Sequence, residues 1–178
     1  MKMNLQFFAV KAVHGKDLIY LMRVLGDTAQ ASVVPYTTED ELSMSADGDT
    51  VITKDGPVTT PGTPEIEFSK TALLFVDEGN ETVDTIVDKL KKAMLNQTKV
   101  ELWEVNLKRP ASSSGKYKGT YYRGTLSEFN VNASAEDNVE VSYTYKVDET
   151  GKDGDVTVSE TQKEVASYVF TDTTETGA

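Results

Sequence analysis

The chain has 178 residues, with 29 Asp and Glu against 18 Lys and Arg, and therefore a net charge of −11. This length fits one domain with its own core, or one domain with long appendages. The acidic balance excludes an ordinary nucleic-acid-binding protein, which needs a basic face to neutralise phosphates. Because there is no cysteine, disulfides, thiolate zinc sites and cysteine nucleophiles are also excluded.

The first third of the chain is predicted to form strands followed by one long polar stretch. Residues 17–25 are apolar on both alternating parities, which is typical of a strand buried on two faces. Residues 31–36 form a short strand candidate that Pro35 restricts to an edge or a strand end. Residues 39–64 are rich in acid, Gly and Pro, and Asp55-Gly56 is a hairpin-turn signal. We expect a projecting, weakly structured hairpin or long loop here; the alternative is a linker between two domains.

Strand character returns at residues 65–76 and is followed by one amphipathic helix, expected at about 81–96. Its apolar residues recur at i, i+3, i+4, i+7 and i+11, which places them on one helix face. Asn80 or Thr82 is expected to cap its first turn. The helix therefore covers one face of a sheet, through a stripe formed by Val83, Ile86, Val87, Leu90 and Met94.

The remainder is predicted to be β. Residues 99–107, 116–126 and 127–133 are three strand candidates, and residues 139–147 alternate apolar and polar side chains with period two. Residues 148–155 are a Gly/Asp loop, and residues 167–171 a last short strand. The segments 1–13 and 172–178 are expected to be flexible arms. The fold class is mainly β: a sandwich or barrel of antiparallel strands flanked by one helix, in a single domain over residues 1–178.

No pattern indicates an enzyme, a cofactor or a metal site. His14 is the only histidine, and no nucleophile elbow, P-loop, dinucleotide fingerprint or zinc-protease motif is present. Apolar runs stay far below the roughly 20 residues of a membrane helix, so no membrane partner is expected. The segment at 5–13 is too short and interrupted for a secretory signal, which favours synthesis in a cytoplasm.

One strand suggests a different class of function. Basic and aromatic residues interleave along residues 116–126, a pattern found where aromatic rings stack on single-stranded bases. A small β-barrel module that binds RNA or carbohydrate is therefore the alternative, although the net charge of −11 opposes RNA. The residues concerned are Lys116, Tyr117, Lys118, Tyr121, Tyr122 and Arg123.

Three stretches in this order resemble the major tail protein, or tail tube protein, of bacteriophages with long non-contractile tails. They are ADGDTVITKDGPVTTPGTPEIEFSKTALL at 46–74, IVDKLKKAMLNQTKVELWEVN at 86–106, and KYKGTYYRGTLSEFNVNASAEDNVEVSYTYKVDETGKDGDVTVSETQ at 116–162. The resemblance covers roughly residues 14–172. The chain is too short for the extra immunoglobulin-like domain that some members carry. Another ring-forming tail or secretion-tube component, or a capsid decoration protein, is the alternative within this structural class.

The resemblance implies a structural virion protein. Six copies would form a ring whose inner sheets join into a barrel, and stacked rings would form the tube through which DNA leaves the capsid. Implied partners are other copies of the chain, the tape measure, tail terminator and distal tail proteins, and DNA that passes without specific binding. The location would be the virion tail, with the host cytoplasm during assembly.

Two sets of residues are candidates for the two functions of such a tube, the stacking of its rings and the lining of its lumen. The projecting loop would bridge neighbouring rings, because a segment of this length and exposure is suited to ordering on contact. Acidic side chains facing the lumen would repel DNA and let it slide. The candidate lumen acids are Glu101, Glu128 and Glu140. The candidate inter-ring loop comprises Asp47, Gly48, Asp49, Thr53, Lys54, Asp55, Gly56, Pro57, Pro61 and Gly62.

Overall fold

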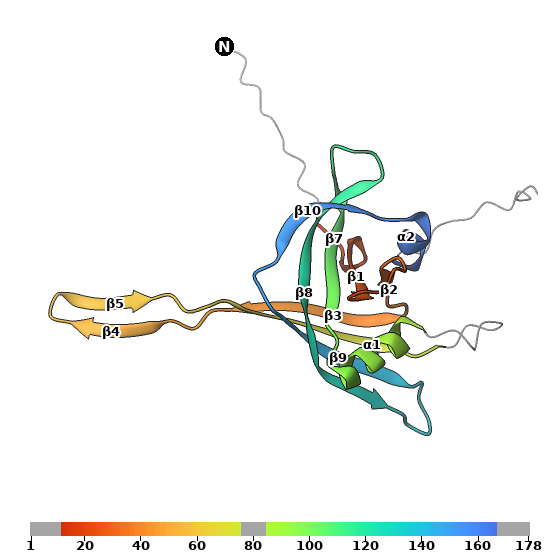
Figure 1. Ribbon diagram of the computed structural model, residues 1–178, viewed down its shortest axis with the longest axis horizontal. Helices are drawn as coiled ribbons and strands as arrows, with labels where there is room; N and C mark the ends of the chain where they lie inside the picture. Colours follow the sequence, from red (N-terminus) through yellow and green to blue (C-terminus); the bar gives the residue numbers. More distant parts are fainter. Residues whose placement is uncertain (1–11, 76–84, 167–178) are drawn as a thin grey trace, which may run out of the picture.

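A computed structural model describes residues 12–75 and 85–166 (Figure 1). A short 3-10 helix at Gly15–Asp17 precedes the first strand. Two helices are described, α1 (Ile86–Asn96) and the short α2 (Glu160–Ala166). The strands are β1 (Leu18–Val24), β2 (Ser32–Val33), β3 (Thr37–Ser45), β4 (Asp49–Thr53), β5 (Gly56–Thr60), β6 (Glu65–Leu73), β7 (Val100–Pro110), β8 (Lys116–Asn132), β9 (Glu140–Val147) and β10 (Lys152–Thr157).

Eight of these strands form one antiparallel sheet in the order β2-β1-β7-β8-β9-β6-β3, with β10 paired to β8. The sheet curls over on itself. The evidence is that the ring of Tyr20 on β1 packs against Phe68 on β6 at 4.5 Å, although β7, β8 and β9 lie between these strands in the sheet. The mainly β, antiparallel fold with one main helix and a projecting loop is confirmed.

The long strand β8 belongs to both halves of the curled sheet. Its first part pairs with β7 on one side and β10 on the other, and its second part pairs with β9 across a bulge between Leu126 and Glu128. The sequence predicted two strands, at 116–126 and 127–133, so that interpretation was wrong. The loop predicted at 148–155 was also wrong in part, because residues from Lys152 onward pair with β8 as β10.

The main core fills the inside of the curl and is covered by α1. Leu90 and Ala93 of the helix are buried in it, with Ile86, Val87 and Met94 packed at its margin. The stripe predicted for the helix is thus confirmed for its described members; Val83 lies outside the described residues. The sheet contributes inward-facing side chains from β1, β6, β7, β8 and β9, namely Tyr20, Met22, Ile66, Phe68, Ala72, Val100, Leu102, Tyr122, Leu126, Val141, Tyr143 and Tyr145.

Helix α1 begins at Ile86, five residues later than the expected start near 81. Thr85 is its N-cap: the Thr85 hydroxyl oxygen accepts from the Asp88 amide at 3.2 Å, while the Asp88 carboxylate accepts from the Thr85 amide at 3.0 Å. This reciprocal capping box satisfies two backbone donors. The caps predicted at Asn80 and Thr82 lie outside the described residues.

A second, smaller apolar cluster explains why β1 is apolar on both parities. Ile19 and Leu21 point away from the main core and pack with Val105 and Val158. The segment that follows β10 covers this face together with α2, whose Gln162 side chain donates to the Ala31 carbonyl. The prediction of a strand buried on two faces is confirmed. Helix α2 was not predicted.

The core tyrosines predict alkaline unfolding. Burial raises the pKa of Tyr20, Tyr143 and Tyr145 above the ordinary value of 10. The stability they contribute is complete below pH 10 and is lost as the pH rises further, because only the unfolded chain then releases these protons. Each group should lower the free energy of unfolding by up to about 1.4 kcal/mol per pH unit.

Urea melts between about pH 8 and 11, read with tyrosinate absorbance, test this expectation. Burial lowers the pKa of Lys70, so this group makes the folded state more stable as the pH rises toward its unfolded value of 10.5. This gain opposes the loss from the tyrosines, but it comes from one group and the loss comes from three. Tyr143→Phe should make the decline above pH 10 shallower. Stability that stays constant up to pH 11 would contradict the prediction.

Candidate functional site: a polar sheet face and a projecting hairpin

Four strands, β3, β6, β9 and the second part of β8, present a polar face on the side away from the core. Residues directly opposite each other in an antiparallel ladder share one face. The registers therefore align three rows of outward side chains across the four strands. The rows are Ser43, Glu67, Lys146 and Thr125; Glu41, Ser69, Thr144 and Glu128; and Glu39, Thr71, Ser142 and Asn130.

This polar sheet face is acidic. Its rows hold Glu39, Glu41, Glu67 and Glu128, and the adjacent ladder positions add Glu65 and Glu140. Lys146 is the one cation in the three rows, and its ammonium group is 2.8 Å from the Glu67 carboxylate. The remaining positions are short Ser, Thr and Asn side chains. The result is a polar surface with excess negative charge, in which short Ser, Thr and Asn side chains separate the glutamates.

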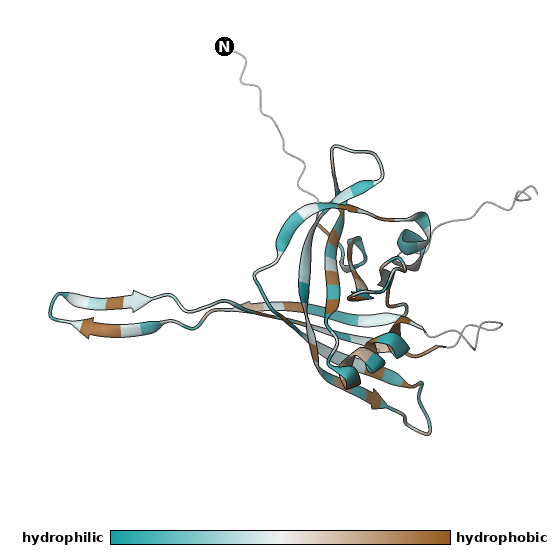
Figure 2. Ribbon diagram, viewed as in Figure 1, coloured by the Kyte–Doolittle hydropathy of each residue, from teal (hydrophilic) through white to brown (hydrophobic). Residues whose placement is uncertain are grey.

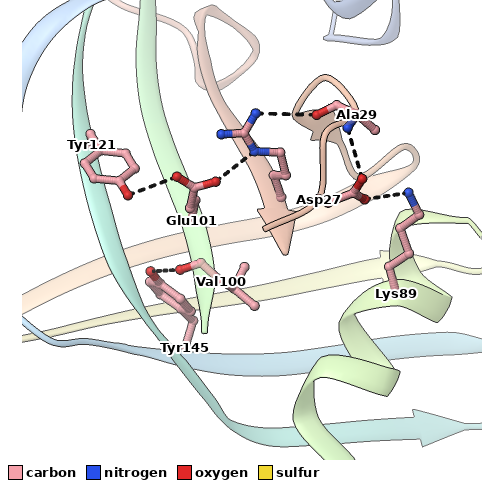
Figure 3. A network of polar contacts seen from close by, with 8 residues as sticks. Asp27, Ala29, Lys89, Val100, Glu101, Tyr121 and Tyr145 are labelled. Atoms are coloured by element: carbon pink, nitrogen blue, oxygen red, sulfur yellow. Dashed lines mark hydrogen bonds and ion pairs between the residues drawn. The ribbon is translucent and has the colours of Figure 1, made fainter. Parts of the chain in front are cut away.

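Two of the three candidate lumen acids, Glu128 and Glu140, lie on the polar sheet face. Glu101 lies on β7 and is only 8% exposed. Its carboxylate accepts from the Arg23 guanidinium at 2.8 Å and from the Tyr121 hydroxyl at 3.0 Å (Figure 3). Its charge is thus compensated within the chain, and it adds little to a repulsive surface.

The strand at residues 116–126, considered above for binding RNA or carbohydrate, uses its side chains for contacts within the chain. Tyr121 packs on Trp103 at 5.2 Å in addition to its bond with Glu101, and Tyr122 is buried in the main core. Tyr117 packs against the second apolar cluster. Lys118 pairs with Asp155 at 2.6 Å. These side chains therefore stabilise the fold and do not form an open stacking platform.

The four-stranded part of the sheet has two edges without a strand partner among residues 12–75 and 85–166. The β7 ladder ends at the pair Val100–Gly124, so residues 125–132 of β8 pair on one side only, with β9. At the other end β3 pairs only with β6. Unpaired edges offer backbone donors and acceptors to another chain.

The hairpin β4–β5 projects from the sheet along the longest dimension of the molecule (Figure 1). It forms its own two-stranded sheet, with Val51 opposite Val58 and Ile52 opposite Pro57. Lys54 and Asp55 form the turn, where the Thr53 hydroxyl donates to the Gly56 carbonyl at 2.7 Å. The predicted Asp-Gly hairpin is confirmed, and the preceding residues 39–45, predicted as part of the loop, belong to β3.

The hairpin is joined to the sheet by a narrow neck in which glycine is required. A Cβ atom on Gly62 would overlap the carbonyl oxygen of Asp47 on the opposite strand, and one on Gly48 would lie 2.7 Å from the Thr60 carbonyl oxygen. Larger residues would force the two strands apart. The glycines and Pro61 therefore fix the direction in which the hairpin leaves the sheet.

Comparisons with known proteins identify this architecture. Residues 12–152 match the family model described as phage tail tube protein. The chain is 32% identical over 170 residues to a protein of Staphylococcus phage phiMR25 that is provisionally named as a tail protein, covering 93% of this chain and 85% of that one. The chain belongs to the phage tail tube protein family, and it is a structural tail protein of the virion.

Solved structures agree with this fold. The tail tube of phage SPP1 superposes with a TM-score of 0.68 at 15% identity, covering 94% of this chain and 95% of the other. The tail of a gene transfer agent particle, refined with C6 symmetry, gives a TM-score of 0.59 at 11% identity, covering 79% and 98%. Among the described residues, no helix combines the length and the apolarity needed to cross a bilayer.

Proposed function

We propose that the chain closes into rings of six by pairing the free edge of β3 with residues 125–132 of β8 in the next copy. The observation that carries this is the strand order. Strands β8, β9, β6 and β3 alternate in direction, so β3 of one copy and β8 of the next would also run antiparallel. A ring built this way leaves neither edge of the four-stranded part unpaired, which removes the hazard of these exposed strand edges.

Ring closure would turn the polar sheet face into the continuous wall of a tube. The acidic rows with Glu128 and Glu140 then line the lumen, where like charge repels DNA and prevents adhesion. Six subunits at −11 carry −66 per ring. We propose that DNA passes through this lumen without specific binding, and that the tube meets tape measure, tail terminator and distal tail proteins after assembly in the host cytoplasm.

The hairpin would join one ring to the next. The hairpin lies at one end of the molecule and includes hydrophobic residues (Figure 2). The side chains of Val51, Ile52 and Val58 are exposed, which supports this role. The inter-ring residues we propose are those from Asp47 to Gly62 named above. Stacking of this kind is a head-to-tail contact that does not close, so it generates a filament.

Deletion of the hairpin, residues 48–60, tests the proposal. The sheet and core do not depend on the hairpin, so the variant should fold with an unchanged near-UV spectrum but form no tubes in negative-stain micrographs at high concentration. Gly62→Ala should have the same effect by redirecting the hairpin at its neck. Gly154→Ala is the matched control, since a Cβ there meets no atom within 4 Å. Tubes of normal length from the deletion variant would refute the role of the hairpin.

A further inference from the structure

Two exposed apolar clusters lie at opposite ends of the β3–β6 ladder. At the hairpin end, Val51, Ile52 and Val58 are 60%, 85% and 55% exposed. At the other end Tyr36 precedes β3 and Phe75 follows β6, and they are 58% and 46% exposed. Water-exposed apolar groups that gather in this way mark surfaces for association.

The aromatic pair Tyr36–Phe75 is held in a fixed arrangement. The ring centroids are 4.0 Å apart with an interplanar angle of 38°. Tyr36 has a φ of 54°, a left-handed backbone conformation that is rare for an aromatic residue and is strained. The Tyr36 carbonyl accepts from the Leu73 amide at 3.0 Å, which anchors this conformation to the end of the ladder. The hydrogen bond and the ring contact together hold the two rings at the surface, outside both apolar clusters.

The hairpin tip has apolar groups on both of its faces. Val51 and Val58 share one face, and Ile52 and Pro57 share the other. A two-stranded hairpin is at best marginally stable in water without packing on another surface. The face with Ile52 is the more exposed one, since the Ile52 side chain is 85% exposed and so is not covered by the described residues of its own chain.

We propose that the Tyr36–Phe75 pair is the acceptor for the Ile52–Pro57 face of the hairpin from a second copy of this chain in the neighbouring ring. The two clusters lie at opposite ends of one ladder, so a translation along the ladder brings the tip of one copy to the acceptor of another. Tip charges also find opposite signs there: Lys54 and Asp55 would approach Glu39 and Lys16, which line the cleft beside Tyr36. The inference rests on the proposed stacking of rings.

Substitution at Tyr36 separates assembly from folding. Asn tolerates the left-handed conformation, so Tyr36→Asn removes the ring while relieving strain. We expect an unchanged or higher melting temperature and a critical concentration for tube formation raised more than about tenfold, as for the loss of an aromatic interface anchor. Phe75→Ser should raise it similarly. Leu95→Ser, at an exposed apolar position on α1, is the control and should assemble normally.

Cross-linking tests the contact directly, because the chain contains no cysteine. Tubes of the double variant Ile52→Cys/Phe75→Cys, treated with a short bis-maleimide, should give covalent oligomers of many subunits. Ile52→Cys/Leu95→Cys should not. Normal assembly of both Tyr36→Asn and Phe75→Ser, or no cross-linking within intact tubes, would overturn the acceptor while leaving tube formation standing. A wild-type protein that forms no tubes would overturn the proposed function, and the acceptor with it.

Discussion

Asp40→Ala is expected to lower the free energy of unfolding by about 2–3 kcal/mol in urea melts at neutral pH. The Lys70 ammonium lies inside the curl of the sheet with its side chain 1% exposed, and it is 2.5 Å from the Asp40 carboxylate. The Thr37 hydroxyl accepts a second bond from it at 3.0 Å. Removing Asp40 leaves a buried cation without its counter-charge. The loss stays below that of a fully buried pair because Asp40 keeps 24% of its side chain exposed.

The control variant is Lys70→Met, which keeps the volume of the side chain and removes the charge. Replacing a buried charge by an apolar group of similar size is often neutral, so the loss should be under about 1 kcal/mol. Burial already lowers the pKa of Lys70, which indicates that the charged form is costly at this position. An Asp40→Ala variant no less stable than Lys70→Met would show that the buried Lys70 does not need the Asp40 carboxylate as its counter-charge.

Charge reversal on the polar sheet face is expected to slow DNA release without preventing tube assembly. Glu128→Lys with Glu140→Lys changes each subunit from −11 to −7 and places lysines where the proposed lumen meets DNA. Lysines that contact phosphates release counterions and hold the DNA, so release should become several-fold slower and recover at higher salt. Tube yield and length by electron microscopy, and ejection kinetics of phage assembled with the variant, are the two measurements.

The matched control is Glu164→Lys with Glu160→Lys on α2. This helix lies beside β2, which is at the far end of the sheet order from β3. The double substitution on α2 changes the net charge by the same amount but on another surface, so DNA release should stay at the wild-type rate. Equal slowing by both pairs would assign the effect to net charge alone and remove the lumen role of the polar sheet face.

The sequence predicted those elements whose pattern reports a single local environment. Alternation along residues 139–147 indicated β9, because Val141, Tyr143 and Tyr145 all point into one core. The stripe on α1 was visible for the same reason. The hairpin was visible from Asp55-Gly56, since turn chemistry acts over a few residues.

Elements that depend on distant partners were missed. Strand β10 has the Gly/Asp composition of a loop and becomes a strand because β8 offers it a long edge. The break expected near Ser127 is a bulge, which lets β8 continue. Glu101 seemed to face water because Arg23, its partner, lies 78 residues away in the chain. The acidic polar sheet face became apparent only once the register aligned side chains from four separate strands.

The continuity of β8 has a mechanical consequence. This strand of 17 residues, roughly 55 Å long at the rise of an extended chain, is bonded to β7, β10 and β9 along its length. A load along the tail would pull these ladders in shear, so that many hydrogen bonds share the force at once. The subunit should therefore behave as a stiff block. If the hairpins join the rings as proposed, the compliance that lets a tail bend would lie in their narrow necks.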